Sequence, residues 1–225
     1  MKPFQPEGHP TPRMSAPVLN RLSVATASSA RDLTPPPVDQ ERLARAVREM
    51  LLAIGEDPDR EGLLDTPARV ARAFAEICGG LREDAAVHLG RVFQEGADDI
   101  VVVRDVELHS ICEHHLLPFT GRAHIAYLPA GGRVVGLSKL ARTVDVFARR
   151  PQVQERLTAQ IADAIAEHLA PRAVAVKIES EHFCMRIRGA KKSGASMLTM
   201  AWRGEWKADA AARAEVARLL DSSNP

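Results

Sequence analysis

The sequence has no excess of charge of either sign. Its 30 lysines and arginines and 29 aspartates and glutamates leave a formal net charge of +1. Nucleic acids and anionic membranes attract proteins that carry a strong positive field. We therefore expect no nucleic-acid partner and no membrane partner, and we expect any anionic ligand to be held by a local cluster of basic side chains.

Long apolar runs are also missing. A membrane-spanning helix needs about 20 consecutive apolar residues, and no run in the chain approaches that length. The first residues, Met1 to Pro6, lack the apolar block of a secretory signal. With 45% apolar and 26% charged residues the composition is that of an ordinary globular protein. We expect an intracellular enzyme.

Cysteine is scarce, with only Cys78, Cys112 and Cys184 in 225 residues. An odd number of cysteines in a chain too large to need disulfide staples favours a reducing compartment, so we expect the cytoplasm. Cys78 has no histidine or cysteine at ligand spacing, and we predict that it is a small buried apolar residue. Cys112 and Cys184 remain as the candidate functional thiols.

Proline interrupts residues 1–38 and includes the run Pro35 to Pro37. Proline removes backbone donors, and the few apolar side chains between the prolines cannot offset the entropy of ordering the segment. We predict a disordered N-terminal arm over 1–38. A transit peptide is the alternative, but Glu7, Asp32 and the prolines disfavour an amphipathic helix.

Two amphipathic helices are predicted in residues 39–88. Asp39 is the predicted N-cap of the first, which Gly55 ends. Thr66 is the predicted N-cap of the second, with Pro67 at the first helical position. We interpret 39–88 as an N-terminal helical region.

Residues 89–222 alternate between β-type and helical patterns. Strands are predicted at 100–103, 123–128, 134–135, 174–178 and 197–202, and helices at 136–149, 152–169 and 208–220. This order predicts an α+β domain in which helices layer on one face of an antiparallel sheet.

Two short runs carry candidate metal ligands. Cys112 and His115 form a C-x-x-H pair. In an extended segment, residues two apart face the same side, so we expect His182 and Cys184 to emerge together from one strand, with Cys184 completing a Cys-His-Cys set. Three protein ligands leave a fourth tetrahedral position for water, which is the arrangement of a catalytic Zn²⁺ site.

Two alternatives stay open at this point. The residues can be buried thiols and core histidines, or they can form a closed structural zinc site with His114 or His182 as the fourth ligand. If the site is open, His114 and His182 are the candidates for proton transfer, because they flank the proposed ligands.

Basic side chains provide candidate anion-binding sites. For each of them, the default interpretation is a solvent-exposed basic surface without a ligand. Ser138 and Lys139 stand at the first turn of a predicted helix and Arg142 lies one turn on, where free backbone N–H groups favour phosphate. Arg186 and Arg188 follow Cys184 and are predicted on one side of a strand. Arg69 and Arg72, three residues apart, form a lone basic pair, and Gln154 and Glu155 begin a helix without any local feature that marks them.

Four blocks of the sequence together resemble the GTP cyclohydrolase I family. They are Cys112 to His115, Gly136 to Arg142, Arg149 to Leu157, and His182 to Cys184. The resemblance spans about Asp39 to Trp206. It implies a zinc-dependent enzyme that opens the imidazole ring of GTP by hydrolysis, releases formate and forms 7,8-dihydroneopterin triphosphate, the first step of folate and tetrahydrobiopterin biosynthesis.

The resemblance also implies roles for individual residues. Cys112, His115 and Cys184 match the zinc ligands, and His114 and His182 match the acid/base histidines. Gln154 and Glu155 match the groups that read the guanine edge. The expected triphosphate-binding residues are Ser138, Lys139, Arg142, Arg188, Arg69 and Arg72.

At the level of assembly, the resemblance implies the tunnelling fold with an N-terminal helical extension and self-association into a toroidal homodecamer. Several phosphate-binding residues then come from neighbouring subunits. Arg72 stands where the family often has lysine, and the stretch 190–202 looks divergent at its end, over Met197 to Trp202. The alternatives are a paralogue that makes a different pterin or a formamidopyrimidine, and a non-catalytic, zinc-containing GTP-binding module.

Overall fold

The structure, a computed structural model, describes residues 36–96 and 98–221. All but the last three residues of the predicted N-terminal arm therefore lie outside the described residues. In the described part, the helices and strands follow the predicted order, in which helices precede strands and two further helices interrupt the sheet. No helix in this part is long and apolar enough to cross a membrane.

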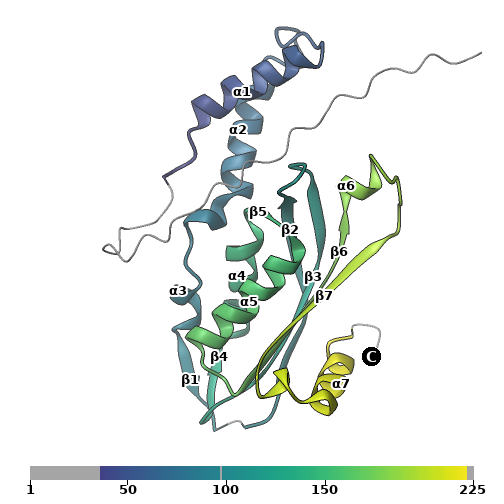
Figure 1. Ribbon diagram of the computed structural model, residues 1–225. Coiled ribbons are helices and arrows are strands. Elements are labelled where there is room, and N and C mark those ends of the chain that lie inside the picture. The colour runs from purple at the N-terminus through teal and green to yellow at the C-terminus, as the bar shows by residue number, and fades with distance from the viewer. Residues whose placement is uncertain (1–35, 97, 222–225) are drawn as a thin grey trace, which may run out of the picture. The chain divides into compact units, whose positions relative to one another are not determined.

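A five-stranded sheet forms the centre of the fold (Figure 1). In spatial order its strands are β5 (Pro151–Gln152), β2 (Val101–Cys112), β3 (Pro118–Leu128), β6 (Ala173–His182) and β7 (Ser196–Gly204). The long strands pair antiparallel and only the short β5 lies parallel to β2. A separate two-stranded sheet joins β1 (Val92–Gln94) to β4 (Arg133–Val135).

Strand register brings two distant sequence segments to one end of this sheet. The β2–β3 pairing ends at Ile111 opposite Pro118, so the tight turn between these strands begins at Cys112. The β3–β6 pairing ends at Phe119 opposite His182. Antiparallel neighbours lie about 5 Å apart, and the C-terminal end of β6 therefore lies beside the Cys112 turn.

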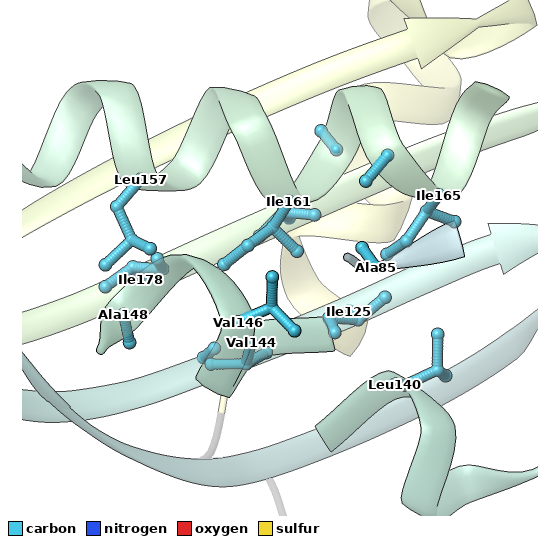
Figure 2. Close-up of a cluster of buried hydrophobic side chains, with 14 of the residues drawn as sticks. Ala85, Ile125, Leu140, Val144, Val146, Ala148, Leu157, Ile161, Ile165 and Ile178 are labelled. Atoms are coloured by element: carbon cyan, nitrogen blue, oxygen red, sulfur yellow. The ribbon is translucent and has the colours of Figure 1, made fainter. Parts of the chain in front are cut away.

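Helices α4 (Leu137–Ala148) and α5 (Gln154–His168) cover one face of the sheet. Leu157, Ile161 and Ile165 recur every four residues along α5, and all three are fully buried. Figure 2 shows them facing the side chains of α4 and the strand residues Ile125 and Ile178. Burying each of these side chains stabilises the fold by about 1.5–3 kcal/mol.

The opposite face of the sheet carries α7 (Ala210–Leu219) and the short 3₁₀ helix η2 (Glu205–Lys207). Trp206, Val216 and Leu220 pack there in a second apolar cluster with Ala126 and Ala175. The α+β class is confirmed, but the prediction that the helices layer on one face was incomplete. The second face presents small alanines, whose weak apolar pattern did not mark it as a packing surface.

The helical region before the sheet contains α1 (Gln40–Ala53), α2 (Thr66–Ile77), the 3₁₀ turn η1 (Gly79–Arg82) and the single turn α3 (Ala86–Leu89). The Asp39 cap is confirmed, because its carboxylate accepts the Arg42 N–H at 2.9 Å. The Thr66 cap was wrong: Thr66 is already helical, and Asp65 precedes the helix with its carboxylate paired to Arg69 at 2.9 Å.

Candidate metal centre and its surroundings

Two thiols and one imidazole meet at the end of the sheet. The ligand atoms of Cys112, His115 and Cys184 all lie within 4.8 Å of one another. Cys112 Sγ is 3.8 Å from His115 Nδ1 and 3.9 Å from Cys184 Sγ. This is the spacing of side chains that can converge on one small ion, and it is the only such group of three among the described residues.

A tight turn positions the first two of these side chains. The Cys112 carbonyl accepts the backbone N–H groups of His115 and Leu116, while the Cys112 N–H donates to the Leu117 carbonyl at 2.8 Å. Leu116 adopts a left-handed conformation with φ of 53°, which non-glycine residues seldom do. The turn thus folds His115 back over Cys112 at the end of β2.

Cys184 reaches the group from a helical turn and not from a strand. β6 ends at His182, and residues Phe183–Arg186 form the single turn α6. The prediction that His182 and Cys184 leave the same strand was therefore wrong, as was the placement of Arg186 on a strand. β6 ends where its pairing with β3 ends, at His182 opposite Phe119 near the start of β3, and this limit is set by pairing between distant segments.

The electrostatics of the two thiols favour a bound cation. Burial, and then the neighbouring Cys112, raise the pKa of the Cys184 thiol above its ordinary value, while Arg188 acts in the opposite direction. Two thiolates this close repel each other unless a cation lies between them, and a divalent metal keeps both ionised. Two sulfurs and one imidazole nitrogen suit zinc among the common metals.

His182 lies next to this group and is held on two sides. Its ring stacks on Phe119 with centroids 4.5 Å apart and planes 8° apart. Its Nε2 lies 2.8 Å from Gln154 Oε1. Burial lowers the pKa of His182, and the charge of Glu155 partly opposes that shift.

His114 is arranged differently from His182. Its side chain is exposed, and its ring meets the His115 ring edge-on at a centroid distance of 6.3 Å. Among the described residues its ring makes no hydrogen bond. His114 is therefore free to turn toward a ligand, whereas His182 is fixed.

The start of α5 contacts both runs that supply the metal-binding group. The Glu113 N–H donates to the Gln152 carbonyl at 3.0 Å, and the Glu113 carboxylate pairs with Arg156. Glu155 is exposed, whereas Gln154 is 1% exposed and its amide is engaged entirely by the chain. The supporting contacts of Gln152 and Arg156 were not predicted from the sequence, because their partner Glu113 is distant in the chain.

The predicted phosphate-binding residues lie in three separate places. Ser138, Lys139 and Arg142 lie in the first two turns of α4, with Ser138 and Arg142 exposed, and Arg188 follows α6. Arg69 and Arg72 are exposed on α2, where Arg69 pairs with Asp65. Of these residues, Arg188 acts electrostatically on Cys184, and the grouping of all six around one ligand stays a prediction.

Comparison with known proteins assigns the family. The family model described as GTP cyclohydrolase I matches residues 43–221. GTP cyclohydrolase 1 of Corynebacterium glutamicum is 58% identical over 183 residues, which cover 81% of this chain and 93% of that protein. The Bacillus subtilis protein of the same name is 56% identical over 179 residues, or 80% and 94% of the two chains. The chain belongs to the GTP cyclohydrolase I family.

Proposed function

We propose that the protein is a zinc-dependent GTP cyclohydrolase I. It opens the imidazole ring of GTP by hydrolysis, releases C8 as formate, and rearranges and closes the product to 7,8-dihydroneopterin triphosphate. The observation that supports this most directly is the meeting of Cys112, His115 and Cys184 beside His182 in a chain of this family. The three free cysteines are consistent with work in the cytoplasm.

Cys112, His115 and Cys184 would hold the zinc ion. With three protein ligands, bound zinc supplies a water of pKa about 7 as the nucleophile at neutral pH. The turn at Cys112 and the helical turn α6 fix the two sulfurs, so the chain sets the geometry of the site before the substrate arrives.

The two histidines divide the proton transfers according to their mobility. His182, stacked on Phe119, protonates the purine ring nitrogen as C8 is attacked. The exposed His114 serves the later steps on the ribose.

Base recognition is assigned to the start of α5. The exposed Glu155 carboxylate, close enough to His182 to affect its pKa, accepts hydrogen bonds from the guanine ring N–H and the exocyclic amine. Adenine offers no such pair of donors. The part of Gln154 in reading the guanine edge stays a prediction. Its side-chain amide is buried and already bonded within the chain.

The triphosphate site is proposed to form between subunits of a toroidal homodecamer with the tunnelling fold. Its residues are Ser138, Lys139, Arg142, Arg188, Arg69 and Arg72. Among the described residues, β7 pairs only with β6. At the other edge, β5 pairs only with Ile111 and Cys112, the last two residues of β2. Both edges of the sheet therefore offer unpaired backbone groups, which closure of a ring would satisfy.

A turnover assay with metal analysis tests the proposed function. Purified protein containing zinc should convert GTP to formate and to a pterin that fluoresces after oxidation, and it should leave ATP unchanged. Mass spectrometry of the product separates this activity from that of a paralogue, which would yield a formamidopyrimidine or another pterin. Recovery of intact GTP from zinc-loaded protein after long incubation would refute catalysis and favour a binding module.

A further inference from the structure

The side-chain amide of Gln154 has one possible orientation. Its Nε2 lies 3.1 Å from the Ile178 carbonyl and 2.9 Å from the Met197 carbonyl. Backbone carbonyl oxygens only accept hydrogen bonds, so the amide NH₂ group must face them. Rotating the amide by 180° would bring a third oxygen against these two, inside a site where Gln154 is 1% exposed.

The oxygen of the same amide then determines where two neighbouring groups carry their protons. Gln154 Oε1 lies 2.5 Å from Ser180 Oγ and 2.8 Å from His182 Nε2. An amide oxygen carries no hydrogen, so both neighbours must donate to it. A neutral His182 therefore carries its proton on Nε2.

Two threonine hydroxyls complete the hydrogen-bond network without a conflict. Thr158 Oγ1 donates to the Gln154 carbonyl at 2.7 Å, so its contact with Thr199 at 2.6 Å requires the Thr199 hydroxyl to donate. Thr199 Oγ1 then accepts from Gln154 Nε2 at 3.2 Å. Every donor has an acceptor, and no buried side-chain nitrogen or oxygen in the described part lacks a partner.

The ring of His182 is also fixed in its plane, by the stacked Phe119, which is fully buried. With Nε2 bound to Gln154, the remaining nitrogen is Nδ1. Among the described residues Nδ1 has no hydrogen-bond partner. It is the one nitrogen of this ring that a nucleotide can reach.

We propose that Gln154 is a positioning residue that holds neutral His182 as the Nε2–H tautomer, so that Nδ1 is the atom that exchanges a proton with the substrate. The proposal rests on the proposed function and deepens it. In the protonated state, Nδ1–H donates its proton to the purine nitrogen, whose lone pair forms the new N–H bond, and the ring returns to the Nε2–H tautomer. The Gln154 amide keeps its orientation throughout.

The tautomer can be tested directly by magic-angle-spinning NMR, a method that is not limited by the size of an assembly. The sample is the metal-loaded, full-length protein labelled with ¹³C,¹⁵N-histidine. The chain has 8 histidines, and comparison with His182→Ala assigns the His182 signals. At about pH 8, where histidine is neutral, we expect Nε2 to show the shift of a protonated nitrogen and Nδ1 that of an unprotonated one. The reverse pattern in the wild type overturns the proposal, and this result needs no Gln154 variant.

Gln154→Leu and Ser180→Ala form a matched pair for the positioning role. Gln154→Leu removes the acceptor of His182, and the tautomer signals should become mixed. Ser180→Ala leaves the Gln154 amide anchored by its two carbonyls, so the Nε2–H pattern should remain. An unmixed Nε2–H pattern in Gln154→Leu overturns the proposal.

Steady-state kinetics separates positioning from base binding. If Gln154 acts through His182, Gln154→Leu should lower kcat for GTP about 100-fold and change KM by no more than about threefold. A raised KM with unchanged kcat shows that Gln154 binds the base, and overturns the proposal. If the wild type does not turn over GTP, the proposed function fails, while the NMR spectrum still decides the tautomer.

Discussion

Strand β6 carries a buried polar cluster on each of its two faces, and the two clusters differ in kind. On the α5 side, Ser180 and His182 join Gln154 through neutral hydrogen bonds. On the α7 side, Lys177 is 4% exposed and pairs with the Asp221 carboxylate, and its cross-strand neighbour His124 is 1% exposed. The first cluster is built from neutral hydrogen bonds only, whereas the second holds a buried ammonium that pairs with the half-exposed Asp221 carboxylate.

Burial of polar groups alone therefore does not identify the functional face. In both clusters the fully buried side-chain nitrogens and oxygens have hydrogen-bond partners, as in native interiors. The His124 ring accepts the Asp105 N–H at 3.2 Å, where a β-bulge gives Asp105 a φ of 59°. Only the α5-side cluster leads to the two thiols, and we expect variants on that side to affect chemistry and variants on the α7 side to affect stability.

Cys184→Ser should have the largest effect, because it removes one sulfur from a three-ligand site. We expect zinc content to fall to a small fraction of wild type and GTP turnover to fall more than about 100-fold. Metal analysis and formate release measure the two effects. Cys78→Ser, at a buried thiol outside the group, should keep both, and His182→Ala should keep zinc but lose turnover. Full zinc and turnover in Cys184→Ser would contradict the assigned site.

Asp221→Asn should have an intermediate effect, and on stability alone. It leaves the Lys177 ammonium, whose side chain is 5% exposed, without its carboxylate. Removing one partner of a fully buried pair costs about 3–5 kcal/mol, and we expect a smaller loss here because the Asp221 side chain is 52% exposed. The loss is measurable as a lower urea midpoint, while GTP turnover per folded protein should not change. Adding Lys177→Met should restore most of the loss, because an apolar side chain of similar length needs no partner. A single variant as stable as wild type would show that Lys177 finds another partner.

Sequence periodicity predicted the fold where local pattern decides it. The α5 positions Leu157, Ile161 and Ile165 form the buried face of that helix, as their spacing predicted. Each predicted strand overlaps an observed one, but the strand ends were not predicted, and the short strands β1 and β5 were missed. β2 continues to Cys112 and β6 stops at His182 because of pairing with β3, and no local pattern shows where a partner strand ends.

The candidate site shows the same limit. The C-x-x-H spacing identified Cys112 and His115, since both lie in one turn. Ser180 could have been found, because it lies two residues before His182 and therefore on the same face of the strand. The link from Gln154 to the Met197 carbonyl spans 43 positions and depends on the folded sheet. The phosphate-binding set remains a prediction.

His124 should give the smallest effect, a pH dependence of stability on the α7 side. Burial lowers the pKa of His124 below its ordinary value of 6.5, and Lys177 and Arg104 lower it further, while Asp105 and Glu179 oppose the shift. As the pH falls through about 6.5, the unfolded chain takes up the proton first. The contribution of His124 to stability is therefore complete above that pH and is lost as the pH falls toward the folded-state pKa.

His124→Asn should flatten this dependence, because its side-chain oxygen can still accept the Asp105 N–H but does not titrate. We expect a loss of about 1 kcal/mol at pH 8 from the smaller side chain, and a smaller decrease in the free energy of unfolding between about pH 7.5 and about pH 5.5 than in wild type. Urea denaturation across that range measures both. His109→Asn, at a side chain that is 67% exposed, is the control and should keep the wild-type pH dependence. If His124→Asn loses stability on acidification as steeply as wild type, the buried ring of His124 is not the source. His182, whose pKa is also lowered by burial, is then the next group to test.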